Sequence, residues 1–362
     1  GELIEEFEDE WQLPENIYTS GPYLLTTGDL SEKRTILQRN VEWPLPRGGN
    51  AEMVNIYFFD DDAGMYELWQ DKQLDIAPLP PDYRDDFLLE YMPRARMVTD
   101  QTVFYISFNF NSGVFREPNL RRAFSAAIDR EALAEELYGG RAEAMRHLGP
   151  PGVVGAPPVD SVGIGYNPDY ARQQLAESAY SSCRLMPPIV FVVSTLDVSL
   201  RQAELIREMW VKELDCTEEQ IILEQVQFGT LLANTRAGAG EARPDVWELG
   251  WSSYYPDQNN WLNELLHCAD SENRAERPCT QFDDLLRQAS QSTDLQERID
   301  LYRQVENGFF GEGGEAPMVP LYVRGFYMMQ QSWLTYTPAH FGGEQYDTYV
   351  IDEELKRLER SR

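Results

Sequence analysis

The chain has 362 residues, of which 42% are hydrophobic and 12% aromatic, so it can bury a sizeable core and form more than one domain. This composition excludes intrinsic disorder, and the formal net charge of -30 excludes a basic surface for nucleic acid or for anionic lipid. The acidic excess is typical of a solvated surface that keeps an exported protein in solution.

The first hundred residues combine short strand patterns with turn signals. Strands are predicted at 33–38 and 54–59, a single helix at 63–70, and turns at Ser20-Gly21-Pro22 and at 47–50. The run 103–110 is rich in β-branched and aromatic residues and predicts a further strand. We place a domain boundary close to this strand.

The middle of the chain predicts helices that alternate with strands. Leu120, Phe124 and Ile128 recur at helical spacing, Asp129 is placed to cap a second helix, and Asn167 is placed to cap a third. A continuous apolar strand follows at 189–193, then a long helix at 200–214 and an extended segment at 221–228. A strand, a helix and a strand in this order predict an α/β layer with a crossover connection.

The last third continues the alternation of strands and helices. A strand at 246–251 runs into a loop, 252–261, that is crowded with aromatic and polar residues. Helices are predicted at 282–290 and 295–309, and a strand at 318–323. No internal repeat is found.

Four Cys residues form two pairs that lie close along the chain, Cys183 with Cys216 and Cys268 with Cys279. Four Cys residues allow three pairings, and only this proximity favours the one given, so four ordinary buried thiols stay the alternative. Zinc is disfavoured because no CxxC pair exists and the three His residues are scattered (His147, His267 and His340). If the disulfides form, the protein works outside the reducing cytosol.

Neither a membrane span nor a cleavable leader is recognisable. No stretch of about 18 apolar residues occurs, and the first ten residues are acidic. We expect that an export signal was removed or that the front of the protein is missing. The acidic run Asp60-Asp61-Asp62 lacks the alternation of a calcium loop, so we predict a solvated turn and no metal site.

Several segments, in order along the chain, resemble signatures of the family 5 extracellular solute-binding proteins, the substrate-binding components of peptide importers of the ABC class. The matching segments cover nearly the whole chain: Ser20-Gly21-Pro22-Tyr23, Leu74-Asp75-Ile76-Ala77, Tyr105 to Asn109, Arg121 to Arg130, Tyr138-Gly139-Gly140, Pro150-Pro151-Gly152, Tyr166-Asn167-Pro168-Asp169, and Gly250-Trp251 followed by Pro256-Asp257. Each segment alone is weak, but their common order indicates membership.

The resemblance implies an α/β, periplasmic-binding-protein-like type II fold, in which two lobes joined by hinge strands close over a ligand. Residues 1–100 and 322–362 are then part of a first lobe, and residues 101–321 form a complete second lobe. The resemblance further implies a monomeric periplasmic or extracellular protein that captures a peptide for an ABC importer permease. It implies no chemistry on the ligand, no cofactor, and membrane attachment only through a lipid anchor on a missing N-terminus.

The resemblance also places a ligand site in the loop 252–261. In peptide-binding relatives a Trp at the position of Trp251 packs on the ligand, and an Asp three residues later pairs with the peptide's amino group. This chain has Tyr254 at the second position, which offers a weak acceptor and a flat face. Asp257 is a candidate substitute, with a helix cap as its alternative role.

Other ligands and functions stay open at this point. Aromatic faces at Trp251, Tyr254, Tyr255 and Trp261, with Asn259 and Asn260, also suit an oligosaccharide, while both Trp residues could instead be core residues. A ligand-binding sensor is a further alternative. An enzyme is disfavoured: Asp257 and Glu264 could serve a glycosidase only at a defined separation, and no nucleophile motif is present. The predicted ligand-binding residues are therefore Trp251, Tyr254, Tyr255, Asp257, Asn259 and Trp261.

Overall fold

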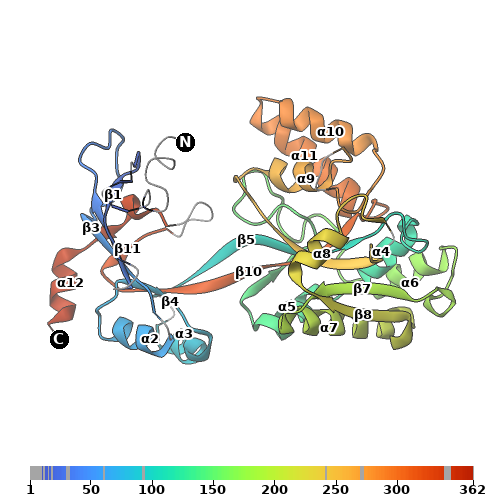
Figure 1. Cartoon of the computed structure of the whole chain (residues 1–362), viewed down its shortest axis with the longest axis horizontal. Helices are drawn as coiled ribbons and strands as arrows, with labels where there is room; N and C mark the ends of the chain where they lie inside the picture. The colour runs from blue at the N-terminus through green and yellow to red at the C-terminus, as the bar shows by residue number, and fades with distance from the viewer. Residues whose placement is uncertain are drawn as a thin grey trace. The chain divides into compact units, whose positions relative to one another are not determined.

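The computed structural model describes residues 10, 13–14, 16–17, 19–29, 33–59, 62–91, 94–240, 243–269, 273–337 and 344–361. Asp60, Asp61, His340 and nearly all of the acidic N-terminal decapeptide lie outside the described residues. The chain divides into two compact units, unit 1 with residues 1–98 and 326–362, and unit 2 with residues 99–325 (Figure 1).

Unit 1 contains an antiparallel sheet of order β1-β2-β3, formed by β1 (Tyr23–Asp29), β2 (Arg34–Arg39) and β3 (Met53–Tyr57). Two helices follow, α2 (Asp62–Gln70) and α3 (Arg84–Tyr91). Trp69 of α2 meets Phe87 of α3 edge to face at 5.1 Å, and both side chains are buried. The prediction of a single helix in this region is wrong, since the structure has two. The sequence does not reveal α3 because this helix buries little more than Phe87 and shows almost no apolar stripe.

The C-terminal segment completes unit 1. The end of β10 (Met318–Gln330) pairs antiparallel with β4 (Ile76–Pro78), and β11 (Leu334–Thr335) pairs with β12 (Val350–Ile351). The last helix, α12 (Glu353–Arg360), brings Lys356 to 2.9 Å from the Asp75 carboxylate. The buried Trp333 donates its indole N–H to the same carboxylate at 2.7 Å, so Asp75 holds together segments far apart in the chain.

Two neighbouring strands cross the boundary between the units, β5 (Ala95–Phe108) and β10. Both are longer than the strands predicted at 103–110 and 318–323. The residues that β5 adds include Arg96 and Gln101, and Arg324-Gly325 interrupts the apolar run of β10, so in both strands the apolar pattern used for the prediction is broken.

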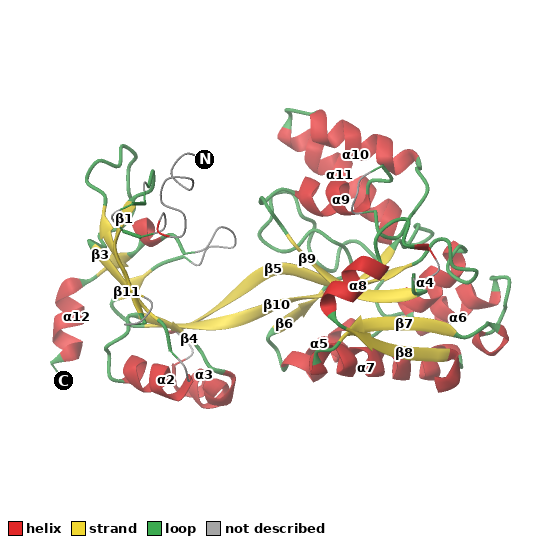
Figure 2. Ribbon diagram, viewed as in Figure 1, coloured by secondary structure: helices red, strands yellow, loops and turns green. Residues whose placement is uncertain are grey.

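Unit 2 is built on a mixed sheet of order β10-β5-β9-β7-β8, with β6 (Ala142–Ala144) also paired to β10. The strand β7 (Ile189–Ser194) runs parallel to both of its neighbours, β8 (Ile221–Val226) and β9 (Val246–Ser252), whereas β5 is antiparallel to β9. Figure 2 shows the arrowheads of β7 and β8 pointing the same way. The carboxyl ends of these parallel strands therefore lie at one edge of the sheet.

Helices cover both faces of this sheet. One face carries α4 (Pro118–Ala126), α5 (Arg130–Tyr138), α6 (Pro168–Ala176) and α7 (Asp197–Leu214), whose apolar side chains share one core. The other face carries α8 (Phe228–Asn234), α9 (Gln258–Leu266), α10 (Gln281–Gln291) and α11 (Leu295–Phe310), which share a second core (Figure 2).

The predicted helix starts in unit 2 agree with the structure. The Asp129 side chain accepts from the N–H of Ala132 at the start of α5, and the Asn167 side chain accepts from the N–H of Tyr170 at the start of α6. Gly139 ends α5 with φ 54°, a backbone conformation that favours glycine. The extended segment predicted at 221–228 is wrong at its end, because Phe228 is the first residue of the short helix α8.

Both expected disulfides are present, Cys183–Cys216 and Cys268–Cys279. The first joins the segment before β7 to the residues after α7, and both of its sulfur-bearing side chains are buried. The second lies beside a buried ion pair in which Arg277 contacts Asp283 at 2.7 Å and Glu315 at 3.1 Å. The N–H of Cys268 donates to the same Asp283 carboxylate at 2.8 Å, which ties the disulfide to the ion pair.

Candidate functional site

The predicted ligand loop begins where β9 ends, at the carboxyl edge of β7, β8 and β9. Ligands of α/β sheets commonly bind outside the carboxyl ends of parallel strands, because the loops that follow the strands converge there. The register pairs Phe191 of β7 with Val246 of β9, so β9 extends beyond the end of β7 before the loop starts. The loop residues therefore stand at the outer rim of this edge.

Trp251 and Tyr254 form an aromatic pair at this rim. The Trp251 side chain is half-buried and donates its indole N–H to the backbone oxygen of Asn260 at 2.9 Å. The ring of Tyr254 meets that of Trp251 edge to face at 5.7 Å, and Tyr254 is 72% exposed. Of the predicted residues, Tyr254 thus presents the largest free aromatic surface.

The polar groups of the loop are bonded to one another. The Tyr255 hydroxyl donates to the Glu264 carboxylate, the Asn259 amide donates to the Tyr255 oxygen at 2.7 Å, and the Tyr302 hydroxyl donates to Asn259 at 3.2 Å. Burial and the adjacent Glu264 raise the pKa of Tyr255 to about 12. Asn260 is fully buried and donates to Glu264 at 3.0 Å. These contacts hold the loop in place.

Among the described residues, the Asp257 carboxylate has two partners. Its carboxylate accepts from the N–H of Asn259 at 2.9 Å at the start of α9, which confirms the helix-cap alternative. One terminal nitrogen of Arg298 also lies 2.8 Å and 2.7 Å from the two carboxylate oxygens. Sequence reasoning missed this partner, since Arg298 follows 41 residues later on α11.

Trp261 does not reach the surface. Its side chain is fully buried and packs in the core that α8 to α11 share. The alternative stated for this residue, a core position, agrees with the structure. The apolar stripe of α9 is the signal for this outcome, because Trp261, Leu262 and Leu265 recur at helical spacing.

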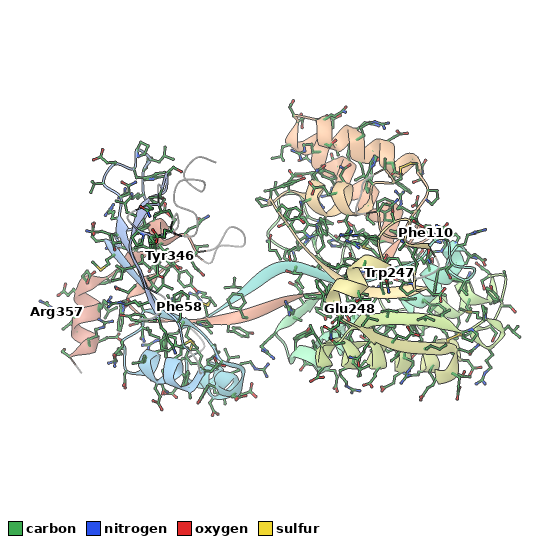
Figure 3. All side chains as sticks on the ribbon, in the orientation of Figure 1. Phe58, Phe110, Trp247, Glu248, Tyr346 and Arg357 are labelled. Carbon is green, nitrogen blue, oxygen red and sulfur yellow. A yellow bond between two sulfur atoms is a disulfide. The ribbon has the colours of Figure 1, made fainter. Side chains whose placement is uncertain are left out.

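Glu248 is a titratable residue of this edge that the sequence does not mark as a site. It lies on β9 next to Trp247, and alternation along a strand sends the two side chains to opposite faces of the sheet (labelled in Figure 3). Ser199 at the start of α7 donates to the Glu248 carboxylate at 3.0 Å. Burial raises the pKa of Glu248 to about 7, although hydrogen bonds from Ser199 and Gln202 oppose the shift. The signal available in the sequence is one acidic residue inside an apolar strand.

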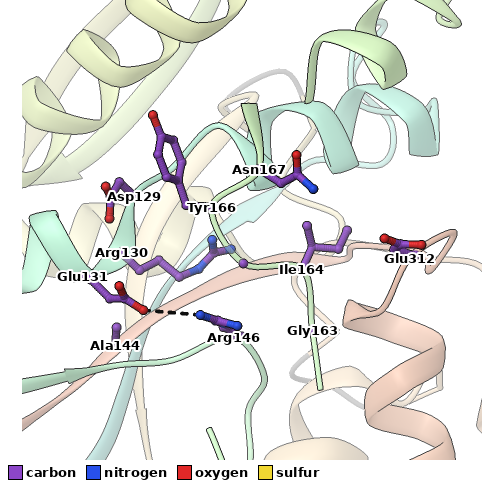
Figure 4. Close-up of a pocket in the computed structure, with 11 residues that line it drawn as sticks. Asp129, Arg130, Glu131, Ala144, Arg146, Gly163, Ile164, Tyr166, Asn167 and Glu312 are labelled. Atoms are coloured by element: carbon purple, nitrogen blue, oxygen red, sulfur yellow. Dashed lines mark hydrogen bonds and ion pairs between the residues drawn. The ribbon is translucent and has the colours of Figure 1, made fainter. Parts of the chain in front are cut away.

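A separate cavity of about 370 Å³ lies in unit 2, at the start of α5 (Figure 4). Arg146 contacts Glu131 across it at 3.3 Å. The buried Arg130 guanidinium donates to the backbone oxygens of Pro320, Ser125 and Ile128, so its hydrogen bonds are used within the fold. These contacts indicate a structural role for the charged lining.

One group of possible metal ligands occurs among the described residues, formed by His267, Cys268 and Asp283. The Cys268 sulfur is in a disulfide, and the Asp283 carboxylate pairs with Arg277. Both groups are thus occupied, and we assign no metal to this cluster. Over the same described part of the chain, no helix combines the length and the apolar character needed to cross a membrane.

The family model of the bacterial extracellular solute-binding proteins, family 5, matches residues 3–273, which is most of the chain. The chain belongs to this family. The resemblance stated from the sequence is thereby confirmed, and members of the family are extracellular binding proteins rather than enzymes.

Curated relatives in this family are distant in sequence. The chain is 24% identical over 357 residues to the probable deoxycholate-binding periplasmic protein YgiS of Escherichia coli, covering 98% of this chain and 63% of the relative. It is 22% identical over 327 residues to the periplasmic oligopeptide-binding protein OppA of Salmonella typhimurium, covering 88% and 58%. The chain therefore spans about three fifths of the length of these relatives.

Solved structures confirm the fold. The unliganded open form of the periplasmic murein tripeptide binding protein MppA superposes with a TM-score of 0.76 at 19% identity, covering 92% of this chain and 63% of that one. HbpA2 from Haemophilus parasuis gives a TM-score of 0.77 at 20% identity, covering 92% and 64%. The two-lobed α/β fold expected from the sequence is thus the fold of this chain.

Proposed function

We propose that this chain captures peptides outside the cytoplasm and delivers them to an ABC importer. The observation that carries the proposal is the family match over residues 3–273 together with relatives named for the peptides that they bind. These relatives are the oligopeptide-binding OppA of Salmonella typhimurium and the dipeptide-binding DppE of Bacillus subtilis. The same match supports the further proposal that the chain binds its ligand without chemistry on it.

The ligand contact in unit 2 is assigned to the rim of the carboxyl edge. Trp251 and the exposed ring of Tyr254 supply flat apolar faces, while Tyr255 and Asn259 keep the loop in position through their mutual hydrogen bond. Asp257 acts through its ion pair with Arg298, which ties the start of α9 to α11. Aromatic side chains suit this role because their rigid rings bury a large area at a small entropic cost.

The chemical identity of the ligand is the part of the proposal that most needs a test. Relatives are also named for deoxycholate and for heme, and the aromatic pair at the rim would suit the apolar face of a sugar as well. Peptides are favoured because more of the named relatives bind them.

The test measures thermal stability of the purified chain with separate sets of di- to pentapeptides, oligosaccharides, deoxycholate and hemin. Selective binding to the folded state raises Tm by mass action, so the peptide set alone should produce a shift, and mass spectrometry should recover the peptide unchanged. Tyr254→Ala should reduce the shift. Leu185→Ala, an exposed position at the opposite end of β7, should not change it. A shift with another set alone, or cleavage of the peptide, contradicts the proposal.

A further inference from the structure

A long connection joins β6 to α6, and its middle part, residues 147–158, lies against the ligand loop. We call this part the support segment. The backbone of Val154 forms a parallel β-bridge with that of Asp257 in the ligand loop. The Gln101 side chain of β5 donates to the carbonyl oxygen of Pro151 at 3.0 Å. The position of the ligand loop therefore depends on how firmly the support segment is held.

The buried Glu306 of α11 holds the start of the support segment. Its carboxylate accepts from the backbone N–H of Leu148 at 3.2 Å and from that of Gly149 at 2.8 Å. A Cβ atom at Gly149 would lie 3.2 Å from this carboxylate and 2.7 Å from the amide nitrogen of Gln258, so the backbone closely approaches both buried groups. Two backbone donors compensate a buried negative charge on Glu306.

The fully buried His147 presents both of its ring nitrogens to acceptors. Its Nε2 lies 3.2 Å from the carbonyl oxygen of Pro158, and its Nδ1 lies 3.6 Å from a carboxylate oxygen of Glu306. A neutral imidazole has one N–H group and a lone pair on its other nitrogen, whereas the imidazolium has two N–H groups. Two acceptors around one ring therefore favour the protonated form, which makes the contact with Glu306 an ion pair.

The groups around His147 agree with this interpretation. Burial lowers the pKa of His147, but Glu306 and the Pro158 carbonyl outweigh it, so the pKa lies above its ordinary value. Among the described residues, Glu306 is the charged group that acts on this ring. From α9, the neutral amide of Gln258 lies beside Gly149. Loss of the proton leaves a buried carboxylate without its cation, which is costly.

We propose that the buried ion pair of His147 and Glu306 positions the ligand loop and makes ligand affinity depend on protonation of His147. This inference rests on the proposed peptide function and adds its regulation by pH. With the proton present, the ion pair holds the support segment on α11, and Val154 holds Asp257. The stabilising effect is fully present below about pH 6.5 and is lost as the pH rises through the higher pKa of the folded state.

The first measurement is an NMR titration of the histidine ring signals of the full chain. The chain has three His residues, so His147→Gln identifies one signal by its loss. If this variant does not fold, His267→Gln and His340→Gln identify the signal by elimination. His147 should titrate above pH 6.5 in the parent. In Glu306→Gln it should titrate at least about one pH unit lower, because burial then acts without the carboxylate. A parent value below 6.5 overturns the inference.

The second measurement, amide hydrogen exchange, shows whether this proton positions the loop. After correction for intrinsic rates, amides of the support segment and of residues 252–257 should exchange at least about 3-fold faster in the parent at about pH 9 than at about pH 5.5. Amides of α7 should not change. His147→Gln should show the faster exchange at both pH values, and the matched control His267→Gln should behave like the parent. Exchange in the parent that does not depend on pH overturns the inference.

The third measurement is the affinity for trialanine by isothermal titration calorimetry. Glu248 titrates near pH 7 and the amino group of the peptide near about pH 8, so the parent is compared with His147→Gln at each pH. The parent should bind at least about 3-fold more tightly than this variant at about pH 5.5 and equally at about pH 9. A ratio that stays constant with pH overturns the regulation, while the peptide function stands. Absence of binding at both pH values contradicts the peptide function, and hydrogen exchange then decides the positioning role of His147.

Discussion

Asp257 shows how one side chain can satisfy several demands of the fold. It caps α9, and its carboxylate also pairs with Arg298 of α11. A carboxylate that is already bonded to a guanidinium gains less from a ligand ammonium than a free carboxylate would, because its charge is compensated. The role of Asp257 at the site is therefore best understood as positioning of the loop.

Glu248 provides a pH-dependent prediction at the same scale. Its pKa is raised from 4.5 to about 7 in the folded chain, so the folded state holds a proton that the unfolded state loses at lower pH. The contribution of the Glu248 carboxyl group to the stability of the fold is fully present below about pH 4.5, and it is lost as the pH rises through about 7. Glu248→Gln removes this loss and should stabilise the protein at pH 8, by about 3 kcal/mol at most, with little effect at pH 4.

The measurement is the difference in Tm between variant and parent across this pH range. Glu224→Gln on β8 is a matched control, because its side chain is exposed. A difference that stays constant with pH, or that grows toward acid, contradicts the buried neutral carboxyl group.

At the scale of elements, short local signals set helix starts and central strands. Asp129 and Asn167 cap their helices as expected, because a cap depends only on residues within one turn. The helices α3 and α8 were not expected, since each buries few apolar residues and shows no clear periodicity. The helix α3 packs on Trp69 and α8 packs on β7, and these contacts are not visible in local sequence patterns.

The two disulfides give a prediction at this scale. Cys183–Cys216 spans 33 residues and Cys268–Cys279 spans 11. In the chain-entropy model, a disulfide raises the free energy of unfolding by restricting the unfolded chain, and the effect grows with the length of the closed loop. The model gives about 4 kcal/mol for the first bridge and about 3 kcal/mol for the second. Replacing both Cys residues of a pair with Ala should therefore lower Tm more for the first bridge than for the second.

Differential scanning calorimetry of the two double variants, with the parent under reducing conditions as reference, tests this order. The reverse order would show that packing around the shorter loop, including the Arg277–Asp283 ion pair, matters more than loop length.

At the scale of the whole molecule, the net charge of -30 dominates long-range electrostatics. Repulsion among like charges weakens the compact state, and salt screens it: the Debye length falls from about 30 Å at about 10 mM to about 3 Å at about 1 M. We expect Tm at pH 7.5 to rise by a few degrees over this range of NaCl. Near pH 4.4, the pI of the sequence, the same salt should have little effect.

Scanning calorimetry at both pH values separates charge repulsion from other effects of salt. A fall in Tm with NaCl at pH 7.5 would show that local ion pairs such as Arg277 with Asp283 outweigh the overall repulsion. An equal rise at both pH values would indicate an effect of salt on apolar burial instead.

The sequence by itself determined the family, the α/β class, the helix caps and the central strands, because these depend on composition, on ordered motifs and on residues close along the chain. The tertiary structure decided which groups of the predicted site are free. It buries Trp261, pairs Asp257 with Arg298 from 41 residues away, and leaves Tyr254 exposed. It also brings the carboxyl ends of β7, β8 and β9 to one edge, because strand pairing joins segments that no local pattern relates.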